Sequence, residues 1–335
     1  MWNIIGHEAA VKLLDSSLKN GRLSHAYLFV GPAQVGKMTL ALNLAQALNC
    51  GSDDKPCGKC SSCKRIMESR YADVQVIAPA GRAEISIDQI RELERYASLK
   101  PFEGGCRVFI IDNAELMSTE AANCLLKTLE EPPPFVYIIL LSSNEKAILP
   151  TILSRCQKLD LRPVSVSDIK NALIERWNVK PDDARVLSRL SSGCMGWAVR
   201  ASAGEEIMTQ RKEQIQTIID VARADRIDRF SYSAEVAGRF SKNRADVHNL
   251  LLLWISWWRD LLLIKSGCHD IITNIDFRET LFREEACYDI IDIRNFITGL
   301  AQAGTLLKNN ANPRLVLDVL ILDMPGRKVA DTAKP

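Results

Sequence analysis

Residues 31–38 have the spacing of a phosphate-binding loop and read Gly-Pro-Ala-Gln-Val-Gly-Lys-Met. In the pattern G-x-x-x-x-G-K-[ST], the glycines let backbone amides surround a phosphate and the lysine supplies positive charge, as Gly31, Gly36 and Lys37 would here. The last position normally provides a hydroxyl ligand for Mg²⁺, whereas this chain has the thioether of Met38, followed by Thr39. We therefore predict a degenerate nucleotide site in which binding of ATP or ADP is weak or absent.

Four of the ten cysteines lie close together, with the spacing C-x6-C-x2-C-x2-C. Four thiolates at this spacing suit a closed tetrahedral Zn²⁺ site, and an iron–sulfur cluster or a redox pair is the alternative. We predict a structural zinc ion with no open coordination position and no catalytic role. The predicted ligands are Cys50, Cys57, Cys60 and Cys63. The six other cysteines are scattered, and we expect them to be small buried hydrophobic side chains.

A predicted strand in the first half of the chain ends in an acidic residue. Residues 107–112 read Arg-Val-Phe-Ile-Ile-Asp, an apolar strand that ends in Asp112. A carboxylate at this place holds Mg²⁺ in P-loop ATPases, and a simple strand-end cap is the alternative. Asn113 follows and cannot accept a proton, and Glu115 would need a different backbone path to replace a catalytic glutamate.

The elements that position these residues alternate along the first half of the chain. Apolar runs near 26–30, 73–77, 107–111 and 135–141 predict strands, separated by helices that include 84–99 and 118–131. This alternation indicates an α/β domain with a mostly parallel sheet. The second half reads as helical, with segments at 166–177 and 182–190 and an apolar stripe formed by Trp254, Trp257, Trp258, Leu261 and Leu262. The stripe is expected to be the core of its own domain, or in part an oligomer contact.

Composition describes a multi-domain globular chain of 335 residues, 47% hydrophobic and 25% charged, with a net charge of +2. Such a small net charge gives no overall field toward nucleic acid, so any such contact must be local. The first residues have no basic region or small-residue cleavage site typical of a secretory signal. The most apolar stretch, 250–264, contains Arg259 and Asp260 and is too short to span a bilayer. We therefore expect a cytoplasmic protein without a membrane partner.

The order of motifs resembles one family, the AAA+ clamp loaders of bacterial DNA polymerase III. The resemblance rests on residues 25–32 (His-Ala-Tyr-Leu-Phe-Val-Gly-Pro), the cysteine insert, residues 121–133 (Ala-Ala-Asn-Cys-Leu-Leu-Lys-Thr-Leu-Glu-Glu-Pro-Pro) and residues 152–156 (Ile-Leu-Ser-Arg-Cys). These segments cover most of residues 1–160. The resemblance implies a RecA-like AAA+ domain over 1–161 with a zinc module at 50–63, a small helical lid domain over 162–204, an all-α collar domain over 205–325 that assembles with sister subunits, and a flexible tail over 326–335.

Three departures from the family's ATPase pattern bear on function. A hydrolysing member resembling this chain would have Thr at position 38, Glu at 113 and a sensor Arg at 196, where this chain has Met38, Asn113 and Gly196. The Ser-Arg-Cys motif with Arg155 is nevertheless present. The resemblance thus implies a non-hydrolysing stator subunit whose Arg155 acts as an arginine finger, in trans, at the ATP site of a neighbouring gamma/tau subunit.

The resemblance also implies partners. They are gamma/tau and delta subunits in a hetero-pentamer, with the sliding clamp and primer-template DNA reached through the complex. A gamma/tau-type ATPase motor with atypical motifs is the alternative. A different AAA+ protein, such as a recombination or repair factor, is disfavoured by the cysteine insert together with the Ser-Arg-Cys motif.

Overall fold

The structure, a computed structural model, describes residues 2–79, 84–103 and 105–327 and divides into two compact units. The first unit contains residues 1–184 and 191–199, and the second contains 185–190 and 200–335. Most of the predicted tail, residues 328–335, lies outside the described part of the chain.

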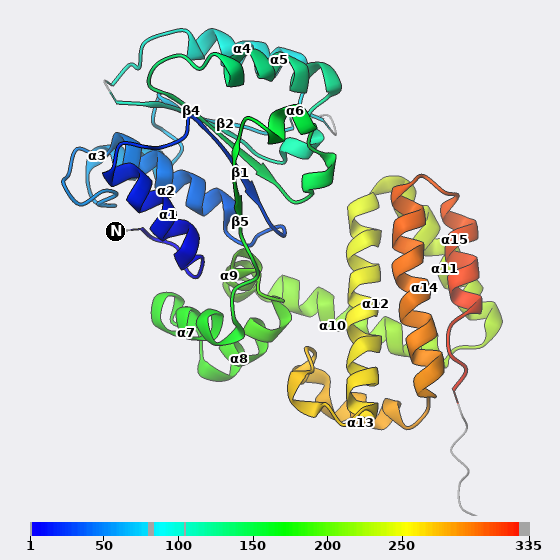
Figure 1. The fold of residues 1–335 in the computed structure, drawn as a ribbon. Coiled ribbons are helices and arrows are strands. Elements are labelled where there is room, and N and C mark those ends of the chain that lie inside the picture. Colours follow the sequence, from blue (N-terminus) through cyan, green and yellow to red (C-terminus); the bar gives the residue numbers. More distant parts are fainter. Residues whose placement is uncertain (1, 80–83, 104, 328–335) are drawn as a thin grey trace, which may run out of the picture. The chain divides into compact units, whose positions relative to one another are not determined.

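The first unit is built on a parallel five-stranded sheet in the order β2-β3-β4-β1-β5 (Figure 1). The four predicted strands are confirmed to within one residue at each end. The fifth, β5, was not predicted because Gln157, Lys158 and Asp160 are polar and only Leu159 is buried. It forms because the open edge of β1 offers backbone partners, and the ladder continues beyond it as Leu161 N donates to Val30 O over 2.7 Å. The strands are β1 (Ala26–Val30), β2 (Val74–Ile77), β3 (Arg107–Ile111), β4 (Val136–Ser142) and β5 (Gln157–Asp160).

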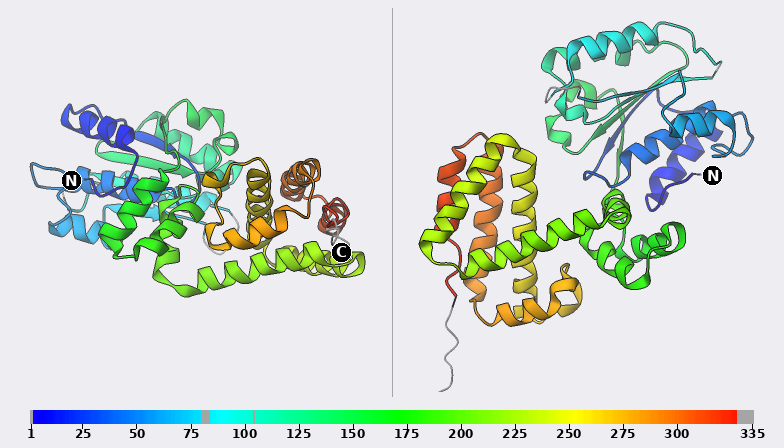
Figure 2. Two further views of the ribbon diagram at one scale, coloured as in Figure 1. Left: turned by 90° about the horizontal axis from the view of Figure 1, so that it is seen from below. Right: turned by 180° about the vertical axis from the view of Figure 1, so that it is seen from behind.

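Helices cover both faces of this sheet (Figures 1 and 2). One face packs against α1, α2 and α3, and the other against α4, α5 and α6, so the sheet is buried on both sides. The two predicted helices are found, one beginning at residue 87 instead of 84 and the other at 119 instead of 118. Each has a serine cap: the Oγ atom of Ser118 accepts the N–H of Ala121, and Ser86 forms a capping box with Gln89. The helices are α1 (Glu8–Lys19), α2 (Lys37–Asn49), α3 (Ser61–Met67), α4 (Ile87–Ala97), α5 (Thr119–Glu130) and α6 (Pro150–Leu153).

Three further helices follow the sheet. The segment predicted at 166–177 is found as α7 (Val166–Trp177), and the one predicted at 182–190 begins one residue earlier as α8 (Pro181–Leu190). The next helix, α9 (Met195–Ala203), was not predicted, because Gly196 in its first turn lowers helix propensity.

The second unit is helical, and its core is centred on α12. The side chains of Trp254, Trp257, Trp258 and Leu261 are buried inside the unit, which confirms that this stripe is the unit's own core, while Leu262 is half-buried. Aromatic rings from other helices complete it, since Tyr288 and Phe296 each meet Trp258 edge-on with ring centroids 5.0 Å apart. The helices are α10 (Glu205–Arg223), α11 (Arg226–Lys242), α12 (Arg244–Lys265), α13 (Arg278–Glu285), α14 (Ile290–Lys308) and α15 (Pro313–Leu322).

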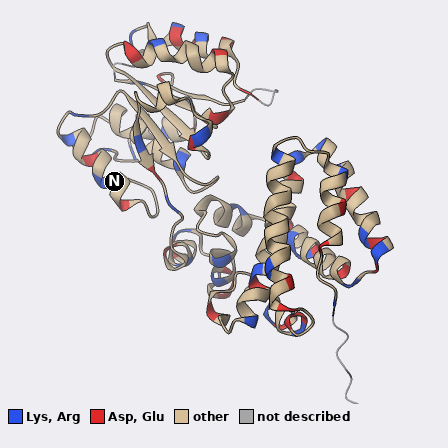
Figure 3. Ribbon diagram, turned by 45° about the vertical axis from the view of Figure 1, so that its right-hand side comes forward, with Lys and Arg blue, Asp and Glu red and all other residues tan. Residues whose placement is uncertain are grey.

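Among the described residues, α12 is one helix that is long and apolar enough to cross a membrane by length and composition alone. The core helix of a soluble protein passes the same test, and the tryptophan stripe of α12 faces its own unit. Charged side chains are instead exposed, as for Arg91, Glu92 and Lys127, and Figure 3 marks the positions of the charged residues along the ribbon.

Candidate nucleotide site and cysteine cluster

The phosphate-binding loop connects β1 directly to α2, which is the strand–loop–helix context that the sequence predicted. The ammonium group of Lys37 folds back on this loop, and its Nζ donates to the carbonyl oxygens of Gly31 and Pro32 over 2.6 and 2.8 Å. Two positions require glycine. A Cβ atom at Gly31 would lie 2.3 Å from the carbonyl oxygen of Leu161, and Gly36 has a φ of 120°.

Two carboxylates lie within electrostatic range of Lys37. Burial lowers the pKa of the Lys37 ammonium, and the charges of Glu115 and Asp112 oppose that effect. Asp112 follows β3 and its Oδ1 accepts the N–H of Asn113 over 3.1 Å. This hydrogen bond is that of a strand-end cap, which is the alternative to the predicted Mg²⁺-binding role of Asp112.

Glu115 makes contacts that the sequence did not predict. The backbone turns sharply at Asn113, which has a φ of 53°, and a short 3-10 helix then carries Glu115 toward the end of β4. Its Oε1 accepts hydrogen bonds from both the backbone N–H, at 3.0 Å, and the hydroxyl of Ser143, whereas Oε2 is buried with no hydrogen-bond partner among the described residues. Burial is the largest single influence and would raise the pKa of Glu115, but hydrogen bonds from Ser143, from Ser142 and from the backbone of Glu115 itself together lower it. The carboxylate therefore links the ends of β3 and β4.

The start of α9 lies directly against the loop. The N–H of Gly196 donates to the carbonyl oxygen of Gln34 over 2.9 Å, and Gln34 has a φ of 62°. A Cβ atom at Gly196 would lie only 2.9 Å from the same oxygen. The position where the resemblance implies a sensor arginine is thus packed against the loop backbone.

The N-terminal segment contacts both the loop and α2. His7 Nε2 lies 3.0 Å from Val35 O, and the N–H of Asn3 donates to Asn43 Oδ1 over 2.7 Å. Beside these contacts is a cavity of about 490 Å³, bordered by the N-terminal segment, the loop, α7 and α9. Its lining includes Ile4, Gly36, Thr39, Trp177 and Met195, whereas Met38 packs against the neighbouring core. No motif signalled these contributions, because they come from segments remote in sequence.

Arg155 lies apart from this loop, between α6 and β5. Its guanidinium donates to Thr151 O over 2.9 Å, Ser154 Oγ over 3.1 Å and Glu130 Oε1 over 2.7 Å. The structure therefore brings Gly31, Gly36, Lys37 and Asp112 together, and Arg155 is bonded to none of them.

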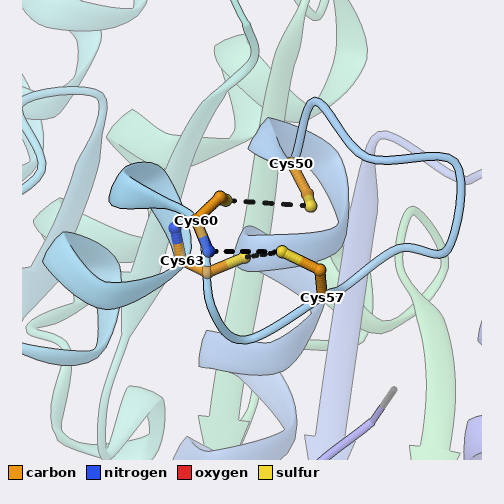
Figure 4. A group of neighbouring side chains, drawn as sticks. All are labelled: Cys50, Cys57, Cys60 and Cys63. Atoms are coloured by element: carbon orange, nitrogen blue, oxygen red, sulfur yellow. Dashed lines mark hydrogen bonds between the residues drawn. The ribbon is translucent and has the colours of Figure 1, made fainter.

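The four predicted zinc ligands converge at the opposite end of α2 from the loop (Figure 4). Their sulfur atoms all lie within 4.8 Å of one another, with Cys50–Cys60 at 3.9 Å and Cys57–Cys63 at 4.0 Å. A tetrahedron with Zn–S bonds of about 2.3 Å has sulfur atoms about 3.8 Å apart. The four sulfur atoms are therefore close enough together to bind one metal ion, and their spacing is compatible with zinc.

Backbone N–H groups support this cluster. The N–H of Cys60 lies 3.3 Å from the Cys57 sulfur, and that of Cys63 lies 3.5 Å from the Cys60 sulfur. Hydrogen bonds from the N–H groups of Lys59 and Cys60 lower the pKa of Cys57 to about 6, whereas burial raises that of Cys63 to about 12. A bound cation would favour the thiolate at every position. Gln46 joins the cluster to α2, since its Nε2 donates to Cys63 O over 2.7 Å.

The expectation for the other cysteines is wrong in part. Cys287 is buried, but Cys268 is exposed in the segment that follows the end of α12. The remaining four are half-buried: Cys106, Cys124, Cys156 and Cys194.

Comparison with known proteins decides the family. The chain is 30% identical over 313 residues to the DNA polymerase III subunit delta' of Bacillus subtilis, covering 93% of this chain and 94% of that protein. The chain belongs to the DNA polymerase III clamp-loader family. A family model described as DNA polymerase III, delta subunit, also matches residues 6–165.

Other members of the clamp-loader family are similar as well. The DNA polymerase III subunit tau of B. subtilis is 28% identical over 348 residues, which cover 96% of this chain and 60% of that protein. Among solved structures, a DNA polymerase III gamma subunit-related protein from Thermotoga maritima has a TM-score of 0.40 and 16% identity over 92% of this chain and 97% of that chain. The T. maritima RuvB branch migration motor has a TM-score of 0.41 and 16% identity over 64% of each chain.

Proposed function

We propose that this chain is the non-hydrolysing stator subunit of a sliding-clamp loader. In this role it completes a hetero-pentameric ring with gamma/tau and delta subunits in the cytoplasm, and Arg155 serves the ATP site of a neighbouring gamma/tau subunit while the ring loads the clamp on primed DNA. The domain scheme of AAA+ domain, lid and collar belongs to the same proposal.

The observation that carries the proposal is the contrast between two sites. In the chain's own nucleotide site, Met38 stands in place of the Mg²⁺-binding hydroxyl, Asn113 in place of the catalytic glutamate and Gly196 in place of the sensor arginine. Each difference removes electrostatic stabilisation from a phosphoryl-transfer transition state in this site. Arg155, by contrast, is retained at the surface with no bond to that site.

A trans role for Arg155 is consistent with the energetics of arginine fingers. An arginine placed against a transferring phosphoryl group accelerates the reaction by about 10³–10⁵-fold, even when a neighbouring protein supplies it. A subunit without its own catalysis can therefore retain a large effect on its neighbour. The cysteine cluster has no open coordination position in this scheme and acts as a structural zinc module.

Two measurements test the proposal. The isolated chain is expected to show no ATP hydrolysis above background, and DNA-stimulated turnover abolished by Lys37→Ala would instead support a gamma/tau-type motor. In a complex reconstituted with ATPase subunits, Arg155→Ala is expected to lower clamp- and DNA-stimulated hydrolysis, whereas Arg22→Ala, at another exposed arginine, is the matched control. Unchanged hydrolysis with Arg155→Ala in an intact complex would refute the finger role.

A further inference from the structure

The guanidinium of Arg155 is held by an acid from a different helix. Glu130 is the last residue of α5, and its Oε1 accepts a hydrogen bond from Arg155 Nη2 over 2.7 Å, forming an ion pair across 25 positions of sequence. The other terminal nitrogen, Nη1, donates to Thr151 O and Ser154 Oγ. Three hydrogen bonds thus fix one end of a side chain that is otherwise long and flexible.

This ion pair lies at the surface, where it contributes little to folding stability. The side chains of Arg155 and Glu130 are 35% and 51% exposed, so water screens the two charges. Because this contribution is weak, the main physical consequence of the ion pair is the orientation of the Arg155 guanidinium group. Orientation matters for arginine because its donors form a rigid planar fork.

The guanidinium group of Arg155 has N–H donors that these hydrogen bonds do not use. A guanidinium carries five N–H donors, and three hydrogen bonds are formed here, all by Nη1 and Nη2. Within the described part of the chain, Nε and the second N–H of Nη2 have no hydrogen-bond partner. Phosphate oxygens accept such paired N–H groups well.

We propose that Glu130 is a positioning residue for Arg155. Its carboxylate anchors one nitrogen of the guanidinium, so that the remaining N–H donors are directed to an anionic group on a neighbouring subunit, namely the phosphates of a bound nucleoside triphosphate. This inference rests on the proposed trans role of Arg155. It adds a residue from the α5 helix end to that role, and it assigns different functions to Glu130 and the adjacent Glu131.

Glu131 provides a matched control. It is also an exposed acid, it follows Glu130 directly, and no hydrogen bond or ion pair of its side chain is found among the described residues. Replacement of either glutamate removes one negative charge from the same helix end. A difference between the two variants therefore reports the contact with Arg155 and not the local charge.

The experiment uses the complete reconstituted complex with ATP, clamp and primed DNA. Glu130→Ala is expected to lower kcat for ATP hydrolysis by about 10-fold, less than the roughly 10²-fold that a 1 Å misplacement can cause, because the other two hydrogen bonds still hold Arg155. KM and complex assembly should be unchanged. Glu130→Gln should be intermediate, since the amide oxygen still accepts a hydrogen bond. Glu131→Ala should match the wild type.

A double-mutant cycle separates this inference from the proposed function. In an Arg155→Ala background, Glu130→Ala should cause no further loss, because it acts only through the arginine. If Arg155→Ala lowers kcat but Glu130→Ala does not, or raises it, the positioning role is refuted and the finger stands. If Arg155→Ala has no effect, both fail. Thermal unfolding and gel filtration of each variant show whether a loss of kcat comes from misfolding. If Glu130→Ala misfolds, the kcat of the more conservative variant Glu130→Gln tests the positioning role instead.

Discussion

The N–H of Gly196 donates a hydrogen bond to the carbonyl oxygen of Gln34, and this contact places the first turn of α9 directly on the phosphate-binding loop. Any side chain at position 196 must displace backbone atoms, since its Cβ would lie 2.9 Å from that oxygen. Position 196, where the resemblance implies a sensor arginine, is therefore packed too closely against the loop for a side chain to be added without a shift of the backbone.

Gly196→Ala should destabilise the chain. We expect the free energy of unfolding to fall by about 1–3 kcal/mol, because the new methyl group overpacks a rigid contact. Urea unfolding followed by circular dichroism measures it. Gly238→Ala is the control, since Gly238 lies inside α11 and a Cβ atom there would have no neighbour within 4 Å. This variant should raise the free energy of unfolding by about 0.5–1 kcal/mol, because alanine favours the helix over glycine. Equal stability of Gly196→Ala and the wild type would contradict the predicted clash.

Restoring two catalytic side chains should not restore catalysis. We expect the double variant Met38→Thr, Asn113→Glu to hydrolyse ATP no faster than background, because position 196 still lacks its arginine and each missing electrostatic stabiliser costs about 10²–10³ in rate. Steady-state phosphate release from the isolated chain is the measurement. Turnover that disappears on adding Lys37→Ala would show that the site needs only those two groups.

The cysteine cluster should hold about one zinc ion per chain. Cys57→Ser and Cys60→Ser are each expected to lower the free energy of unfolding by roughly 2 kcal/mol or more, because metal binding is coupled to folding. Cys268→Ser, at an exposed thiol outside the cluster, should change it by less than about 0.5 kcal/mol. Elemental analysis of protein purified with thiol protection provides the zinc content, and absence of metal would refute the assignment.

Glu115 should make stability depend on pH in the acid range. Its pKa is lower in the folded state, so its contribution is present above about pH 4.3, the ordinary value for glutamate, and is lost as pH falls through the folded-state pKa. Glu115→Gln should therefore lower the free energy of unfolding by about 1 kcal/mol at pH 7, after allowance for solvent screening, and by less at pH 3. Urea unfolding at both pH values, with Glu131→Gln as control, measures the difference. A cost that does not change with pH would argue against the Ser143 contact.

Local patterns in the sequence were sufficient for much of the first unit. The glycine–lysine spacing of residues 31–37 predicted the loop between β1 and α2, and the spacing of Cys50, Cys57, Cys60 and Cys63 predicted a cluster that the structure forms. These features depend on residues close in sequence, whose spacing determines whether amides or sulfur atoms converge. The same reasoning identified the tryptophan stripe of α12, since helical periodicity alone places those side chains on one face.

Other features were decided only by the tertiary structure. The polar β5 is a strand because β1 has an open edge, and Cys268, unlike Cys287, is exposed. The contacts of Gly196 with Gln34, Glu115 with Ser143 and Glu130 with Arg155 join residues 25 or more positions apart. The sequence by itself determined which chemical groups the chain has and where most of its helices and strands begin. Which groups meet was decided by the order of parallel strands and the packing of helices on them, because contacts between distant segments depend on the path of the whole chain.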